Sequence, residues 1–306
     1  MTVAQDQTIL EPQPLLPAEL EKEIFEVLAL SSLKLIPKLV LVSKRVRIWL
    51  EPLLYRHLSV CSLDFRRDRS ELLRISSNEC LEILDSKPAS FLRDHVRYLA
   101  LTNIPDATVE RILSSCTEIR SLAIFQIDPI PILLPLIQAA PLVHLSINVT
   151  QLCGPVAHFE PSAFARLTHL EIFGTKKQPS SCWGGDLGRL PALTHLLVHC
   201  IPWGSPEPPF RDILAECRAL EVLIQLLAHE EDAASYAYFA DDARAVTWLS
   251  GTFLDDWEKS MLGGEDHWFL ADAFVHRRRT GQIAASEYAI PRTWRPYVSG
   301  IRHLYS

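Results

Sequence analysis

Three histidines recur at nearly equal intervals in the middle of the chain. His144, His169 and His195 are separated by 25 and 26 residues, and each is the third residue of a similar six-residue segment. If these segments form adjacent parallel strands in register, their side chains stand in one row. Imidazole is a common zinc ligand, and its charge changes near pH 6.5. Such a row suits either metal binding or a pH-sensitive contact.

A linear row is a poor zinc site. Neighbouring strands lie about 4.8 Å apart, so the three histidines span about 9.6 Å. Three bonds of about 2.1 Å cannot join such a row to one ion without distortion. The seven cysteines contain no C-x-x-C pair, and their wide spacing is typical of buried thiols in a reducing compartment. We therefore expect no metal, no other cofactor, and an intracellular location, cytoplasmic or nuclear.

The histidines belong to a repeat with the pattern apolar-x-x-Leu-x-apolar. Five copies start 23 to 26 residues apart, at Val96, Ile119, Leu142, Leu167 and Leu193, and a degenerate sixth starts at Leu220. These intervals are typical of leucine-rich repeats. In a strand, the fourth and sixth residues of each copy point to one face, and the third and fifth to the other. The pattern predicts strands with one buried face.

Helical returns are expected between the copies. Asp106 to Cys116 combines an acidic first residue with an apolar stripe, and Pro129 to Ala140 and Phe210 to Cys217 have similar patterns. Repeated units of strand and helix stack parallel strands into a curved solenoid around one shared core. The expected fold class is α/β, with a leucine-rich-repeat solenoid over residues 95–250.

The second face of the strands is the expected binding surface for a partner protein, because histidines and aromatic residues on a concave sheet suit protein contacts. The candidate partner-binding residues on it are Tyr98, Phe125, His144, His169, Glu171, Phe173, His195 and His199. We expect binding there to weaken below about pH 6.5 as the histidines gain charge. The alternative is that loops of the same chain cover this face.

Residues 15–58 have the pattern of two or three short amphipathic helices. Leu20, Ile24 and Leu28 lie on one stripe of a helix that begins after Pro17, with acidic residues in its first turn. A second apolar stripe follows from Leu39 to Leu53, with basic residues on its polar side. Helices this few and this short do not bury their own apolar faces well.

This stretch resembles an F-box. The resemblance is carried by Leu16-Pro17 with Glu19, by Ile24 and Leu28, by Leu39 with Val42-Ser43-Lys44-Arg45, and by the ending Leu54-Tyr55-Arg56-His57-Leu58. It implies the substrate receptor of an SCF-type ubiquitin ligase, in which this module docks on a Skp-type adaptor and the repeats hold a target protein. By analogy, the adaptor-binding residues are Leu16, Pro17, Ile24, Leu28, Leu39 and Val42. The alternative is that these side chains pack within the chain against Leu63, Leu72 and Leu73.

The expected domain order follows from these patterns. It is a disordered tail (1–14), the F-box-like helical module (15–58), a helical connector (59–94), the solenoid (95–250) and a helical C-terminal cap (251–306). Trp257 and Phe274 are expected to bury against the last repeat as part of this cap. The alternative for the C-terminal segment is a docking helix for a partner.

Charge and motifs exclude several classes of function. The net charge of −7 disfavours nucleic-acid binding, and five prolines interrupt the uncharged stretch Pro129 to Phe159, so we expect no membrane span. The chain lacks the P-loop, GxSxG and HExxH motifs, so we do not expect an enzyme. Two interpretations remain: an F-box-like receptor with leucine-rich repeats, and a stand-alone repeat protein that binds a partner without any ligase connection.

Overall fold

The fold comes from a computed structural model, which describes residues 16–61, 72–125, 132–148, 160–173, 187–199, 210–227, 229–249 and 253–296. The chain divides into two compact units, residues 1–54 and 55–306. The tail expected at residues 1–14 lies outside the described residues. No helix in the described ranges is long and apolar enough to cross a lipid bilayer.

The first unit is helical, as the apolar stripes predict. It contains α1 (Ala18–Ser31), η1 (Leu33–Leu35), α2 (Ile36–Leu39) and most of α3 (Lys44–Arg56). Four side chains form its fully buried centre: Ala29, Ile36, Val46 and Leu50. A salt bridge between Arg45 and Glu21 joins α3 to α1. A core of this size leaves most of the apolar stripe of α1 uncovered.

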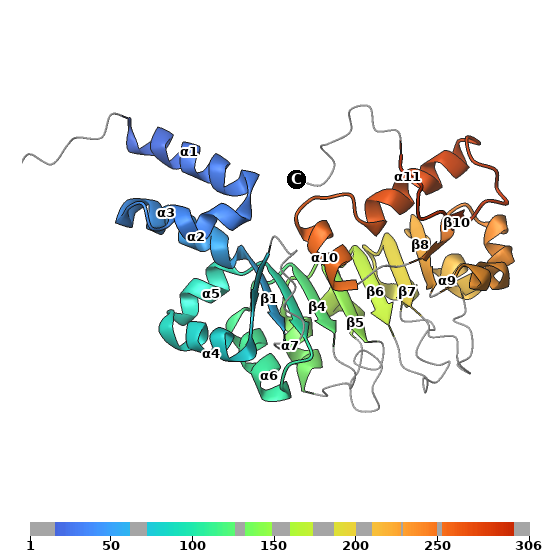
Figure 1. Ribbon diagram of the computed structural model, residues 1–306. Coiled ribbons are helices and arrows are strands. Elements are labelled where there is room, and N and C mark those ends of the chain that lie inside the picture. Colours follow the sequence, from blue (N-terminus) through green and yellow to red (C-terminus); the bar gives the residue numbers. More distant parts are fainter. Residues whose placement is uncertain are drawn as a thin grey trace, which may run out of the picture. The chain divides into compact units, whose positions relative to one another are not determined.

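The second unit is built on one parallel sheet (Figure 1). The described strands are β1 (His57–Cys61), β2 (Leu73–Ile75), β3 (Tyr98–Thr102), β4 (Ser121–Phe125), β5 (His144–Asn148), β6 (His169–Phe173), β7 (His195–His199), β8 (Val222–Leu227), β9 (Ala245–Leu249) and β10 (Ala289–Ile290). Their order is β10-β9-β8-β7-β6-β5-β4-β3-β1-β2. The predicted α/β class with a parallel sheet is confirmed, and this arrangement is compatible with a solenoid.

Helical segments connect successive strands and share one core with them. These are α4 (Ser77–Ser86), α5 (Ala89–His95), α6 (Asp106–Ser115), α7 (Leu133–Ala139), η3 (Pro161–Phe164), η5 (Leu187–Arg189), α9 (Phe210–Glu216) and η6 (Glu230–Asp241). The fourth residue of each copy, from Leu99 to Leu223, pairs in register with the next and is at most 2% exposed. The repeated leucine therefore forms the continuous core, as the pattern predicts.

The prediction of a helical connector at residues 59–94 is wrong in part. It contains α4 and α5, but β1 and β2 also fall within or overlap it, and β1 lies between β2 and β3 in the sheet. The segment from Tyr55 to Val60 fits the repeat pattern with an aromatic first residue, and Leu58 and Val60 are buried in the shared core. The sheet thus begins inside the stretch expected to end the helical module.

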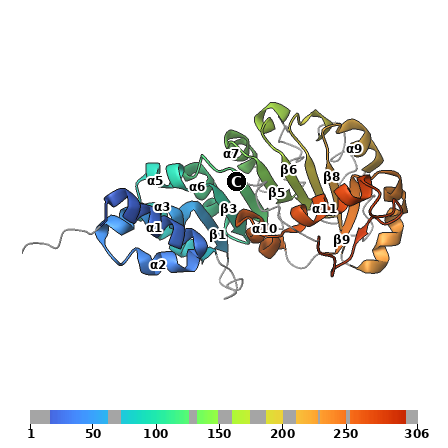
Figure 2. The ribbon, with the colours of Figure 1, turned by 90° about the horizontal axis from the view of Figure 1, so that it is seen from above.

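The C-terminal segment contains α10 (Phe253–Met261) and α11 (His267–Arg279). Both helices lie on the face of the sheet opposite the connecting helices (Figures 1 and 2). Phe274 is buried against β7 to β9, whereas Trp257 lines a cavity with residues of β5 and β6. Beyond β9 the sheet is extended by β10. The segment was expected to cap one end of the array, and its two helices instead run along one face.

Candidate functional site

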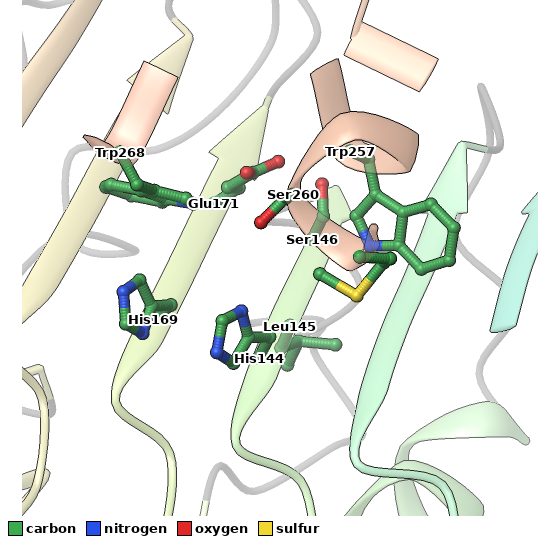
Figure 3. A pocket seen from close by; sticks show the side chains of 9 residues that line it. His144, Leu145, Ser146, His169, Glu171, Trp257, Ser260 and Trp268 are labelled. Atoms are coloured by element: carbon green, nitrogen blue, oxygen red, sulfur yellow. The ribbon is translucent and has the colours of Figure 1, made fainter. Parts of the chain in front are cut away.

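The predicted histidine row is present in the sheet. Strand pairing aligns His57, Tyr98, Ser121, His144, His169, His195 and Val222 in one register. The ring centroids of His144 and His169 are 4.2 Å apart, and those of His169 and His195 are 4.1 Å apart. The rings are nearly parallel, at 13° and 8°. Figure 3 shows His144 and His169 side by side on neighbouring strands.

This stacking does not make a metal site. Parallel stacked rings direct their nitrogens along similar lines rather than toward one point, as tetrahedral zinc coordination would require. Among the described residues, no group of three His, Cys, Asp or Glu side chains is placed to hold a metal ion.

The expectation that this strand face is free is wrong. His169, Glu171 and His195 are only 6–7% exposed, because the C-terminal helices cover them. The Trp268 ring meets His169 and His195 edge-on, at centroid distances of 5.2 and 5.6 Å. The apolar fifth-position residues Leu197 of β7 and Ile224 of β8 let Phe274 of α11 pack on the same face. The covering elements are helices, not the loops considered from the sequence.

Buried polar contacts fix these helices to the sheet. The Arg74 guanidinium of β2 forms a bidentate ion pair with Glu258 of α10, both distances being 2.7 Å. His267 Nε2 of α11 lies 2.9 Å from Glu171 Oε1 of β6. His195 Nε2 lies 3.0 Å from the carboxylate of Asp272. Charge-assisted contacts of this kind impose a defined register as well as attraction.

Burial and pairing set the charge of the site. Burial lowers the pKa of His144 to about 4 and holds the pKa of His169 well below 6.5, to which the neighbouring imidazoles contribute. Burial alone would raise the pKa of Glu171 and lower that of His267. Their mutual attraction and hydrogen bond outweigh burial, so the pKa of Glu171 is lowered and that of His267 is raised. At neutral pH, His144 and His169 are neutral and stand beside a charged pair.

A small cavity lies between the sheet and the helices (Figure 3). Its lining residues are His144, Leu145, Ser146, His169, Glu171, Trp257, Ser260, Met261 and Trp268. Its volume of about 10 Å³ is close to the minimum that holds one water molecule. A cavity of this size is too small for an organic ligand.

The remaining candidate residues of this face are partly exposed. Tyr98 stacks on His57 at a centroid distance of 4.5 Å. Phe125 and Phe173, near the carboxyl ends of their strands, stack across β5 at 5.7 Å. His199 is half-buried, and burial lowers its pKa. These residues do not join the buried cluster around Trp268.

The candidate adaptor-binding residues are mostly exposed. Leu16, Ile24, Leu28 and Val42 are 41–61% exposed, and Pro17 is exposed too. Leu39 is half-buried and packs against the module core. Of the proposed intramolecular partners, Leu72 is buried in the second unit, whereas Leu63 and the Leu73 side chain lie outside the described residues.

Several residues of the site were not predicted from the sequence. His57 occupies the same register position on β1, next to Tyr98, and could have been found by allowing Tyr55 as the first residue of a repeat copy. Arg74 and Glu258 carry no local signal, because 184 residues separate them. The same holds for His267 and Asp272, whose partners lie on distant strands.

No protein-family model matches the chain, and the search of curated proteins gives no match either.

Proposed function

We propose that the protein is an interaction receptor, specifically the substrate-recognition subunit of an SCF-type ubiquitin ligase. In this proposal the N-terminal unit is an F-box-like module that binds a Skp-type adaptor. The second unit is a leucine-rich-repeat solenoid that binds the target protein. The distribution of exposed apolar side chains carries the proposal. Of the eleven large hydrophobic residues that are exposed in the described structure, nine lie in the helical module.

This concentration supports docking because large exposed apolar patches mark interaction surfaces. The nine residues are Leu16, Leu20, Ile24, Val27, Leu28, Leu30, Leu41, Val42 and Ile48. They extend over both faces of α1, the α2–α3 connection and, with Ile48, α3, which the four-residue module core cannot cover. A helical partner surface that buried them would remove apolar area from water and stabilise the module at the same time.

The second candidate is a stand-alone repeat protein that binds a partner without any ligase connection. The central part of the strand face, where a target was expected to bind, is already occupied by α10 and α11. A receptor must therefore bind its target at another surface, or release one of these helices so that the target can take its place. A stand-alone repeat protein that binds its partner through the repeats is under the same constraint.

Co-purification with a Skp-type adaptor tests the proposal. We expect the wild-type chain to retain the adaptor through gel filtration and the double variant Leu16→Asp/Ile24→Asp to lose it. Both positions are exposed, so the circular dichroism spectrum should be unchanged. The matched control is Ile132→Asp, an equally exposed apolar residue outside the module, which should retain the adaptor. A folded wild-type chain that does not bind the adaptor would favour the stand-alone repeat protein.

A further inference from the structure

Helix α10 lies across the part of the strand face that β1, β3, β4 and β5 form. Glu258 pairs with Arg74 of β2, and the backbone of Met261 hydrogen-bonds to His57 of β1. The adjacent Trp257, together with Ser260 and Met261, lines the small cavity beside Ser146 of β5. Because β3 and β4 lie between β1 and β5 in the sheet, the helix spans them as well (Figures 1 and 2).

The two C-terminal helices are held by different means. Four side chains of α11, including Trp268 and Phe274, join an apolar cluster with β7 to β9, and Arg278 donates to five backbone carbonyl groups. No side chain described for α10 belongs to an apolar cluster. Among the described side chains of α10, the buried apolar contribution comes from Trp257, which is 2% exposed, beside the Arg74–Glu258 ion pair. Among the described side chains, burial of apolar area therefore anchors α11 more firmly than α10.

Several buried polar atoms of α10 and of the strands that it faces lack hydrogen-bond partners among the described residues. The hydroxyls of Ser59 and Ser121 and the indole N–H of Trp257 are buried, and none has a hydrogen-bond partner among the described residues. A buried donor without a partner disfavours the contact in which it is buried. The docked position of α10 is therefore less favourable than its buried area suggests.

A glycine pair connects the two helices. Gly263 has a φ of +68°, in the left-handed region of the backbone map, and Gly264 follows it directly. Glycine adopts such a backbone conformation without strain and gives the connection conformational freedom. The amides of both glycines hydrogen-bond to the last turn of α10, so this pair ends the helix and is the point at which a backbone rotation would separate α10 from α11.

We infer that α10 is an exchangeable occupant of this face, and that the same face binds a helix of a partner protein. The track beneath it consists of the small fifth-position residues Ser59, Ala100, Ala123 and Ser146. Arg74, opposite Ser59 on β2, lies at one end of this track. Side chains this small let a helix approach closely.

Arg74 determines the chemistry of the partner. Its side chain is only 7% exposed while paired, and a helix that covered it without a carboxylate would leave a buried charge uncompensated. The partner helix therefore carries an aromatic residue followed by an acidic residue, as Trp257-Glu258 does in α10. This inference concerns the receptor half of the proposed function. Its test uses no adaptor, so the two proposals can fail separately.

A peptide in trans tests the exchange. The probe is a fluorescent peptide of residues 253–262, FLDDWEKSML, and the protein is the full chain with Trp257→Ala and Glu258→Gln. We expect saturable binding to this variant, and at least ~10-fold weaker binding to the wild-type chain, whose own helix competes at high effective concentration. A folded variant that does not bind the peptide overturns the inference.

A charge reversal provides the matched control. Adding Arg74→Glu to the variant should abolish binding of the probe, and a peptide with Glu258→Arg should restore it. Equal binding of the original peptide with and without Arg74→Glu would show non-specific adsorption and would also overturn the inference.

Hydrogen exchange on the wild-type chain needs no substitution. We expect the amides of α10 to exchange at least ~10-fold faster than those of α11, through local opening. Equal protection of the two helices would mean that α10 leaves the sheet only when α11 does, which contradicts the exchange.

Discussion

His267 and Glu171 form a buried ion pair that joins α11 to β6, with Nε2 and Oε1 2.9 Å apart and both side chains at most 7% exposed. The pair lies next to the neutral histidine row, so one small region contains both charged and uncharged imidazoles. Breaking a buried pair by removing one partner leaves an uncompensated charge, which is costly in a protein interior. The stability of the covered face therefore depends on this pair.

Glu171→Gln should destabilise the second unit strongly. Removing the carboxylate leaves the His267 imidazolium without its partner, and the expected loss is about 3–5 kcal/mol in the free energy of unfolding. Urea denaturation at pH 7 measures it. The double variant Glu171→Gln/His267→Gln should be less destabilised than the sum of the two single variants, because the second change removes the stranded charge. Additive effects would contradict a direct interaction.

The second unit should lose stability as the pH falls from about 6.5 toward 4. His144 and His169 have lowered pKa values, so the unfolded chain binds more protons than the folded chain in this range. Each such histidine contributes a slope of up to ~1.4 kcal/mol per pH unit. The lowered pKa of Glu171 acts in the same direction at the acidic end, because its contribution is lost as the carboxylate is protonated. His267, with its raised pKa, contributes most at low pH and loses its contribution as the pH rises through the folded-state pKa.

Urea midpoints measured between pH 7 and pH 4 test this dependence. His144→Gln should reduce the slope, whereas the exposed His276→Gln should leave it unchanged. The other charged groups that face the row, Asp266 and Asp272, come from α11 and its N-cap. A slope that is the same in wild type and in His144→Gln would show that folding does not lower the pKa of this histidine.

The repeat pattern was enough to predict the core of the second unit. The recurring leucine fixes which face of each strand is buried, and the shared position within the six-residue pattern fixes the register, so the row from Tyr98 to His195 was predicted residue by residue. These features depend on residues at most one repeat apart. Local periodicity carries that information directly.

The covering of the other face could not be predicted in this way. It depends on pairs such as Arg74 with Glu258, which are far apart in the sequence and follow no period. Strand β1 was missed for another reason: Tyr55 replaces the usual aliphatic first residue, and α3 runs directly into the strand. The F-box resemblance also directed the interpretation of this segment toward helix.

Arg278→Met should loosen α11 and the segment around η6. The guanidinium donates to the carbonyl groups of Phe239, Ala245 and Ala285, among others, and several of these carbonyl groups are buried. Leaving these carbonyl groups without a hydrogen-bond donor should lower the free energy of unfolding by about 3 kcal/mol or more. Thermal unfolding measures the loss, and the neighbouring Arg277→Met is the control. Arg277 lies 5.7 Å from the Trp294 ring centroid, a contact of about 1 kcal/mol at most. Similar losses for both variants would contradict a special role for Arg278.

The N-terminal module should unfold separately when its small core is damaged. Leu50 is one of the four fully buried core side chains, and Leu50→Ala should cost about 2–5 kcal/mol, which a core of this size cannot spare. The matched control on the same helix is Ile48→Ala, because Ile48 is 72% exposed and its truncation should change stability by less than about 0.5 kcal/mol. Hydrogen exchange should show α1 and α3 losing protection in Leu50→Ala, while β3 to β8 stay protected. Loss of protection in those strands as well would show that the two units fold as one.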